Sequence, residues 1–181
     1  RPRGIWRLLE AFENLPNDQE RLVITGRGPD QTLVEEAARK NPNINYRGFL
    51  QTESERLAVI READVLVNPH EIKTPEARYL FPSKLAEYLA SGRLVVSSNL
   101  PGMKKFPVEE MVLYGEDSAD TLAAAMSSAM KLSAEERREK GARAREWAKT
   151  HFDWDRIAGE LFDFIEGRGS SVCVTDATLE K

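Results

Sequence analysis

The stretch that decides the fold is YLFPSKLAEYLASGRLVVS, residues 79–97. Pro82 suits the first turn of a helix, because its missing N–H would be unpaired there in any case. Two leucines four residues apart then mark the buried side of a helix expected over residues 82–91. Gly92 follows, and the apolar run at 93–97 is typical of a buried strand. A helix that leads directly into a buried strand is a unit of a parallel α/β sheet.

The same alternation extends in both directions along the chain. Strands are expected at 21–25, 44–47, 64–68, 93–97 and 111–114. Helices are expected at 5–12, 30–40, 53–62, 82–91, 117–131, 134–150 and 153–166, with an irregular stretch at 69–81. The strands are apolar runs, which indicates a parallel sheet covered on both faces. The fold class is therefore α/β, a Rossmann-like doubly wound parallel sheet whose ligands sit beyond the carboxyl ends of the strands.

Composition narrows the possible functions. The 181 residues fit one domain, and a net charge of −4 argues against a non-specific nucleic-acid binder, which needs a broad basic face. Cys173 is the single cysteine, so no internal disulfide can form and a cytoplasmic setting is expected. Together with only two histidines, it does not suggest a zinc site. The sequence contains no apolar run long enough to span a bilayer, and its first residues do not resemble a signal peptide.

The ends of the chain suggest a circular permutation. The chain opens on a helix, whereas a doubly wound sheet needs its first strand at the centre. The β-prone run VCVT at 172–175 could supply that strand. The expected organisation is a Rossmann-like domain at 1–166, a linker at 167–171, and a central strand supplied by the tail at 172–181. A disordered tail is the alternative.

Three residues at the start of the helix at 82–91 are candidates for chemistry. Lys84 lies in the first turn beside Ser83, where a cation opposes the helix dipole at a cost of roughly 0.3–1 kcal/mol. That placement makes sense if an anion binds there, although a solvated lysine is an equal alternative. Glu87 lies about 200° around the helix from Leu85, so it is off the core. A carboxylate there could accept both hydrogens of a ribose diol, or it could be an ordinary surface glutamate.

Residues 81–96, FPSKLAEYLASGRLVV, closely resemble the donor-site signature of the family-4, or group 1, retaining glycosyltransferases. In that family the signature lies in the C-terminal, Rossmann-like half of a two-domain GT-B fold. The turn GRGP at 26–29, the segment YRGF at 46–49 and the segment IREADVLVNP at 60–69 resemble the corresponding parts of that half. The closing helices, with Trp147 and the segment FDW at 152–154, are also similar.

The resemblance implies roles for individual residues. Glu87 would bind the ribose hydroxyls, while Ser83 and Lys84 would contact the diphosphate or the sugar. Arg3 and Gly4 resemble the pair that stabilises the leaving diphosphate, so Arg3 and Lys84 are the candidate catalytic residues. The loop at Gly48 and Phe49 would hold the base, largely through its backbone.

One position departs from the family pattern. Many members have a glutamate eight residues before the ribose-binding one, where it holds the donor hexose, and here that residue is Tyr79. Glu76 or Glu71 could substitute from the longer loop. His70 is a candidate sugar contact, and a solvent-exposed loop histidine is its alternative.

The expected function is therefore the donor-binding half of a retaining glycosyltransferase, with a nucleoside-diphosphate sugar as substrate and neither cofactor nor metal. Transfer would require an N-terminal GT-B domain that nothing in this chain resembles, and any peripheral membrane association would come only through the parent protein. A stand-alone nucleotide-sugar binding module and a fragment of a GT-B-fold epimerase are the alternatives. The sequence does not choose between UDP and GDP, nor does it identify the sugar or the acceptor.

Overall fold

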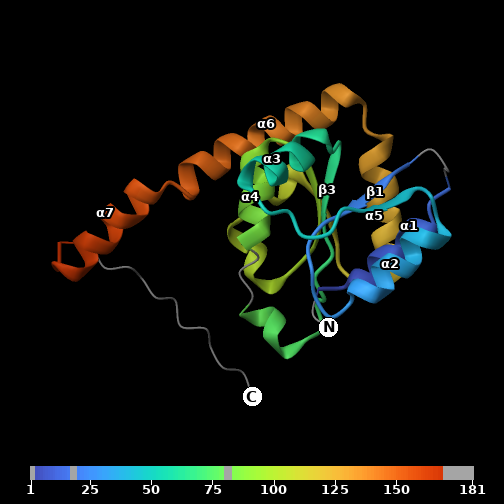
Figure 1. The fold of residues 1–181 in the computed structure, drawn as a ribbon. Helices are drawn as coiled ribbons and strands as arrows, with labels where there is room; N and C mark the ends of the chain where they lie inside the picture. The colour runs from blue at the N-terminus through green and yellow to red at the C-terminus, as the bar shows by residue number, and fades with distance from the viewer. Residues whose placement is uncertain (1–2, 17–19, 80–82, 169–181) are drawn as a thin grey trace, which may run out of the picture.

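The computed structural model describes residues 3–16, 20–79 and 83–168 (Figure 1). Its helices are α1 (Ile5–Glu13), α2 (Gln31–Lys40), α3 (Glu53–Glu62), α4 (Ser83–Ser91), α5 (Ala119–Lys131), α6 (Ala134–His151) and α7 (Trp154–Ile165). Its strands are β1 (Leu22–Ile24), β2 (Ile44–Tyr46), β3 (Val65–Asn68), β4 (Leu94–Ser98) and β5 (Met111–Tyr114). Short 3-10 helices lie at η1 (Pro75–Arg78), η2 (Pro101–Lys105) and η3 (Val108–Glu110). Every helix and strand expected between residues 5 and 166 is present, and the stretch expected to be irregular contains η1.

All strand pairs are parallel, as the apolar runs predict. β3, β4 and β5 form one sheet in that order, and β1 pairs with β2 in a second sheet. The single continuous sheet expected from the sequence is therefore present in two pieces within the described residues. The physical reason is that no described strand lies between β1 and β3 to join their edges.

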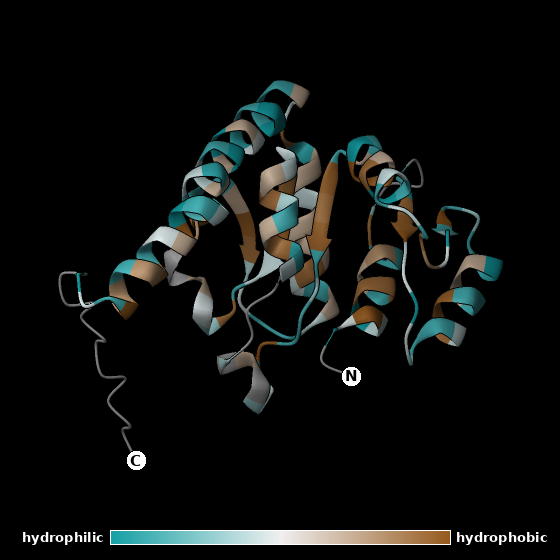
Figure 2. Ribbon diagram, turned by 60° about the vertical axis from the view of Figure 1, so that its left-hand side comes forward, coloured by the Kyte–Doolittle hydropathy of each residue, from teal (hydrophilic) through white to brown (hydrophobic). Residues whose placement is uncertain are grey.

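Helices cover both faces of the larger sheet. In β4, Leu94 and Val96 pack into a core with residues of α1 and α5, whereas Val95 packs into a second core with residues of α4 and α6. Successive residues of a strand point to opposite faces, so one strand contributes to both cores. Figure 2 shows the apolar strands enclosed between helices whose hydrophilic residues face outward. The doubly wound α/β class is confirmed.

The position of α4 is fixed by close packing against α6. Leu85 and Leu89 are fully buried, which confirms the expected core side of this helix. At Gly141 of α6 a Cβ atom would collide with the carbonyl oxygen of Gly92, so only glycine allows the two segments to approach this closely. α4 is therefore anchored by its own buried residues and, just past its last residue, by the contact between Gly92 and α6.

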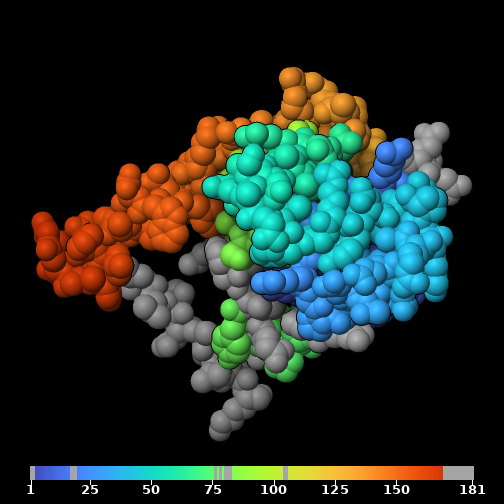
Figure 3. Space-filling model, viewed as in Figure 1, coloured from blue at the N-terminus to red at the C-terminus, as the bar shows by residue number. Residues whose placement is uncertain are grey.

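The last helix, α7, stands clear of the sheet and its covering helices (Figures 1 and 3). None of its residues is buried, although its sequence, WDRIAGELFDFI, contains several large apolar side chains. Gly167 adopts a left-handed φ of 68° after the helix ends, which is the usual conformation of a helix C-terminus. The proposed tail strand at 172–181 and most of the linker at 167–171 lie outside the described residues. Among the described helices, none is long and apolar enough to cross a membrane.

Candidate functional site

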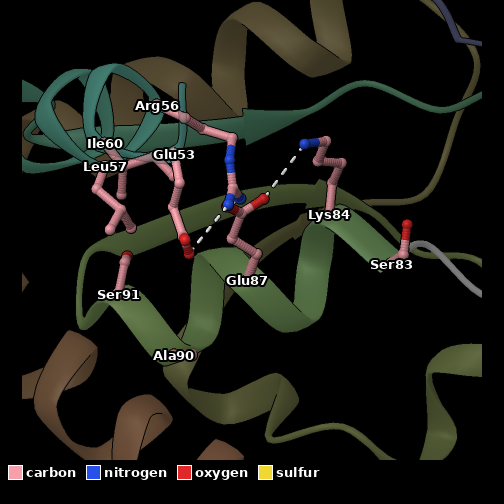
Figure 4. A pocket seen from close by; sticks show the side chains of 9 residues that line it. All are labelled: Glu53, Arg56, Leu57, Ile60, Ser83, Lys84, Glu87, Ala90 and Ser91. Carbon is pink, nitrogen blue, oxygen red and sulfur yellow. Dashed lines mark hydrogen bonds and ion pairs between the residues drawn. The ribbon is translucent and has the colours of Figure 1, made fainter. Parts of the chain in front are cut away.

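A pocket of about 450 Å³ lies between α3 and α4 (Figure 4). Three of the residues expected from the sequence, Ser83, Lys84 and Glu87, line it together. The other lining residues are Ala90 and Ser91 of α4 and Glu53, Arg56, Leu57 and Ile60 of α3. The α4 residues reach this pocket because the buried leucines of that helix turn the opposite side toward α3.

The start of α3 is locked by a capping box. The Thr52 hydroxyl accepts a hydrogen bond from the Glu55 backbone N–H at 3.1 Å, and the Glu55 carboxylate accepts one from the Thr52 N–H at 2.9 Å. The backbone N–H groups of Thr52 and Gln51 lower the pKa of Glu55, so its carboxylate stays charged. This cap fixes the first turn of α3 and with it the position of Arg56.

The Glu87 carboxylate is held by two cations. Its Oε1 pairs with Arg56 from the facing helix, and its Oε2 lies 3.3 Å from Nζ of Lys84 (Figure 4). Arg56 also pairs with Glu53 at 3.5 Å. A carboxylate has about four lone-pair positions, so the carboxylate of Glu87 retains acceptor capacity beyond these two contacts. Arg56 is not among the residues expected from the sequence, since no local pattern distinguishes a charged residue at this position of a helix from a solvated one.

Arg3 and Gly4 lie against the loop that follows β3. Gly4 has a left-handed φ of 61°, and a Cβ atom there would collide with the carbonyl oxygen of Pro69. Burial and the charges of Arg56 and Arg3 lower the pKa of Lys84 below the usual lysine value. Arg3, Arg56 and Lys84 therefore bring three positive charges near the start of α4, where Glu53 and Glu87 balance only part of them. An anion bound beside Arg3 and Lys84 would reduce the remaining repulsion.

His70 is half-buried beside this cluster. Its Nδ1 lies 2.7 Å from Oδ1 of Asn68, whose Nδ2 donates to Oγ of Ser97 at 2.9 Å. Burial and the charge of Arg3 lower the pKa of His70, which favours the neutral ring. The structure thus places His70 close to Arg3 and ties it to the carboxyl ends of two strands.

Glu71 points into a different set of contacts. It lies 3.8 Å from the buried Arg7 of α1 and accepts a hydrogen bond from the Trp6 indole at 3.4 Å. Arg7 also pairs with Asp117 at 3.3 Å, and the Asp117 carboxylate accepts backbone hydrogen bonds from Ile72 and Lys73, each at 2.8 Å. These contacts anchor the loop after β3 on α1. Glu71 is not among the residues that line the pocket between α3 and α4.

Tyr79 lies apart from that pocket. Its side chain is 88% exposed and borders a second, open pocket of about 600 Å³, together with Ile72, Lys73, Thr74, Pro75 and Pro101. Glu76 belongs to η1, in the same loop. The structure therefore does not bring Tyr79 into the group formed by Ser83, Lys84 and Glu87.

Gly48 and Phe49 follow the carboxyl end of β2. Gly48 has a left-handed φ of 66°, and its carbonyl oxygen accepts a hydrogen bond from the N–H of Gly26 at 2.7 Å. This contact ties together the turns that follow β1 and β2. The Phe49 ring is half-exposed, and the Arg27 guanidinium lies 4.5 Å from its centroid. An exposed ring with a cation over it can stack on a flat ligand.

Metal ligation is not evident in the described part of the chain. Within residues 3–16, 20–79 and 83–168, no group of three histidine, cysteine, aspartate or glutamate side chains is arranged to hold a metal ion. His151 stacks on Trp147 with centroids 4.1 Å apart, which accounts for it as a packing residue.

Solved structures with the same fold belong to glycosyltransferases. Sucrose-phosphate synthase from Thermosynechococcus elongatus is 24% identical, with a TM-score of 0.71 over 93% of this chain and 44% of that one. HepE from Anabaena, in complex with UDP and glucose, is 16% identical, with a TM-score of 0.71 over 91% of this chain and 45% of that one. This chain thus spans under half the length of these two proteins.

A third solved structure is itself a single half. The C-terminal domain of a group 1 family glycosyl transferase, LpcC from Francisella tularensis, is 16% identical, with a TM-score of 0.66 over 84% of this chain and 81% of that one. A search of the curated proteins finds no match. The family model for "Glycosyl transferases group 1" matches residues 1–131, which contain every residue of the site described above. The chain therefore belongs to the group 1 glycosyl transferases.

Proposed function

We propose that this chain is the donor-binding half of a retaining glycosyltransferase and that a nucleoside-diphosphate sugar binds along the pocket between α3 and α4. The observation that carries the proposal is the arrangement at the start of α4, where Glu87, Lys84 and Arg3 come together from two distant segments. Glu87 accepts hydrogen bonds from the ribose hydroxyls. Lys84 and Arg3 neutralise the diphosphate, which also relieves the repulsion between them. Retention of stereochemistry comes from the family resemblance.

The chemistry that this half supplies is stabilisation of the leaving group. When the bond between the sugar and the diphosphate breaks, negative charge grows on the departing phosphate oxygen. Lys84, Arg3 and the backbone amides of the first turn of α4 can stabilise that charge. Fixed cations and amides can act in this way without a metal ion, and we propose a metal-independent reaction on that ground.

The acceptor site lies, in this proposal, on a second domain that precedes this one in the parent protein. The lengths of sucrose-phosphate synthase and HepE relative to this chain support a two-domain parent. The exposed apolar side chains of α7 also support it: Trp154, Leu161, Phe162, Phe164 and Ile165 are each more than half exposed. A cluster of this kind usually marks an interaction surface. The chain alone would then bind the donor without transferring the sugar, and cytoplasmic nucleotide sugars would be its substrates.

Thermal shift measurements with UDP, GDP, ADP and their sugar conjugates test the proposal. A ligand at 100 times its dissociation constant stabilises the folded state by about 2.7 kcal/mol, so the preferred nucleotide should raise the melting temperature by several degrees. A panel in which no nucleoside diphosphate raises the melting temperature would refute donor binding.

A turnover assay on this chain and on a chain that includes the second domain then separates a half-enzyme from a stand-alone binding module. Transfer only by the longer chain supports the half-enzyme. Epimerised sugar as the product would instead identify an epimerase.

A further inference from the structure

A buried relay of hydrogen bonds leads from β4 to His70. Ser97 is fully buried, and its hydroxyl has two neighbours that can only accept: the carbonyl oxygen of Ser98 at 3.1 Å and the sulfur of Met103 at 3.8 Å. A hydroxyl group has one hydrogen, and here that hydrogen is directed to one of these two acceptors. Ser97 Oγ must therefore accept the hydrogen bond from Asn68 at 2.9 Å. The amide of Asn68 is oriented with its Nδ2 toward Ser97.

The orientation of Asn68 determines the tautomer of His70. With Nδ2 on Ser97, the Oδ1 of Asn68 faces Nδ1 of His70 at 2.7 Å. A carbonyl oxygen only accepts, so Nδ1 of His70 carries the hydrogen. A neutral imidazole has a single N–H, which leaves Nε2 with a lone pair. Because Asn68 is itself buried at 3% exposure and paired in register with Ser97 on the neighbouring strand, the relay is rigid.

His70 lies at the opposite end of the site from Glu87. Lys84 lies between them because of the direction of α4, which connects the parallel strands β3 and β4 and therefore begins at the carboxyl end of β3 and runs away from it. His70 follows the end of β3, Lys84 is in the first turn of α4, and Glu87, which pairs with Lys84 at 3.3 Å, is one turn further away. The backbone contact between Gly4 and Pro69 places Arg3 beside His70 in space. A nucleoside-diphosphate sugar is a linear molecule in the order base, ribose, diphosphate and sugar. With ribose at Glu87 and diphosphate at Lys84, the sugar comes next, on the side of His70.

We propose that Nε2 of His70 accepts a hydrogen bond from a hydroxyl group of the donor sugar, and that Asn68 and Ser97 hold the ring in the tautomer this requires. The inference rests on the proposed function. A neutral nitrogen with a lone pair can receive an O–H but not a phosphate oxygen, which has no hydrogen to donate at neutral pH. His70 therefore recognises the sugar, while Lys84 and Arg3 recognise the diphosphate.

The tautomer is measured directly by nitrogen-15 NMR of the two histidine rings, with a His151→Gln variant to assign the signals. At neutral pH the ring of His70 is expected to be neutral with hydrogen on Nδ1, and Asn68→Ala is expected to give a mixture of tautomers. A neutral ring with hydrogen on Nε2, or a charged ring, overturns the proposal because Nε2 could then not accept. This measurement needs no ligand.

Binding is measured with UDP and UDP-glucose as the probes. His70→Phe keeps an aromatic ring and removes the acceptor, whereas His70→Gln keeps a polar side chain of similar reach. Loss of one neutral hydrogen bond is expected to weaken UDP-glucose binding by roughly 2- to 12-fold in His70→Phe, with UDP binding unchanged and His70→Gln closer to the parent chain. Deoxy analogues of UDP-glucose identify the hydroxyl group concerned, since His70→Phe should not weaken binding of the analogue that lacks that hydroxyl.

The outcomes separate the two proposals. If neither UDP nor UDP-glucose binds the parent chain, the proposed function fails for this donor and the sugar contact fails with it. If both bind and His70→Phe weakens them by the same factor, or weakens neither, the sugar contact fails while the donor site stands. A melting temperature for each variant shows whether it is folded during the measurement.

Discussion

Replacing Glu87 with alanine is the most direct test of the ribose contact. The carboxylate retains acceptor capacity beyond Arg56 and Lys84, and charge-assisted hydrogen bonds to ribose hydroxyls would use it. Losing one such bond costs about 1–3 kcal/mol, which corresponds to roughly 5- to 150-fold weaker binding of a nucleoside diphosphate. Isothermal titration calorimetry with UDP and GDP measures this loss.

Folding should be affected much less than binding. The Glu87 side chain is 20% exposed, and its partners Arg56 and Lys84 are 37% and 50% exposed. Ion pairs exposed to this extent contribute about 0.2–1 kcal/mol each, so the free energy of unfolding should fall by at most about 2 kcal/mol. The melting temperature would drop by a few degrees, at about 2–4 °C per kcal/mol for a domain of this size. An unfolded variant would contradict the placement of Glu87 off the core.

A 2′-deoxy nucleotide turns the measurement into a thermodynamic cycle. If Glu87 binds the ribose diol, Glu87→Ala should weaken UDP binding more than 2′-deoxy-UDP binding, because the deoxy ligand lacks one of the hydroxyls concerned. Glu53→Ala is the matched control, since Glu53 lines the same pocket and also pairs with Arg56. The assignment of the ribose to Glu87 would be refuted if Glu87→Ala weakened binding of both ligands equally. It would also be refuted if Glu53→Ala weakened UDP binding relative to 2′-deoxy-UDP binding as much as Glu87→Ala does.

Four further predictions test other parts of the structure. Lys84→Ala should weaken UDP binding far more than uridine binding, and calorimetry with both ligands checks this; an equal loss would exclude a phosphate role. The pKa of Lys84 is lowered, so Lys84 should lose its charge, and UDP affinity should fall, at a lower pH than for an ordinary lysine. Over the same pH interval the free energy of unfolding of the empty domain should rise, because the folded state binds fewer protons than the unfolded chain. Arg7→Ala leaves the partly buried Asp117 and Glu71 without their cation, so denaturant unfolding should show a loss of roughly 3–5 kcal/mol, and a loss under 1 kcal/mol would contradict the anchoring role of Arg7. This chain alone should give no sugar transfer in a product assay, and rates on the order of 1–10³ per second would defeat the half-enzyme proposal.

Local patterns in the sequence were sufficient to predict the helices and strands. Leu85 and Leu89 share one side of α4, and both are fully buried in the structure. The same helical geometry was enough to place Glu87 off the core, and in the structure Glu87 lines one pocket with Ser83 and Lys84 of the first turn. These predictions succeed because a helix converts sequence spacing into direction without knowledge of its neighbours.

Contacts between segments could not be predicted in the same way. Arg56 reaches Glu87 across two helices, and nothing in the local sequence of α3 distinguishes it from a solvated arginine. The relay from Ser97 to His70 depends on the register that places Asn68 opposite Ser97, 29 residues further along the chain. Register is a property of the assembled sheet, so the sequence shows that His70 is polar and in a loop but not which of its nitrogens carries the hydrogen.

The central strand of the sheet is the part of the fold that remains a prediction from the sequence. In the described residues β1 pairs only with β2 and β3 only with β4, which leaves one edge of each without a strand partner, as expected for a sheet that lacks its central strand. The tail hypothesis assigns residues 172–175 to that position. Five linker residues span at most about 16–18 Å, so α7 would have to end close to the sheet. In Figure 1 it ends away from the sheet, so the hypothesis also requires α7 to fold back at its junction with α6.

Truncation after Gly167 tests this hypothesis. If the tail supplies a buried central strand, the shortened chain should lose cooperative thermal unfolding, because two sheet edges would lose their backbone partners. Replacing residues 172–175 with alternating glycine and serine, at unchanged length, is the matched control and should have the same effect. A shortened chain that melts with the midpoint of the full chain would show that the edges of β1 and β3 are not joined by the tail.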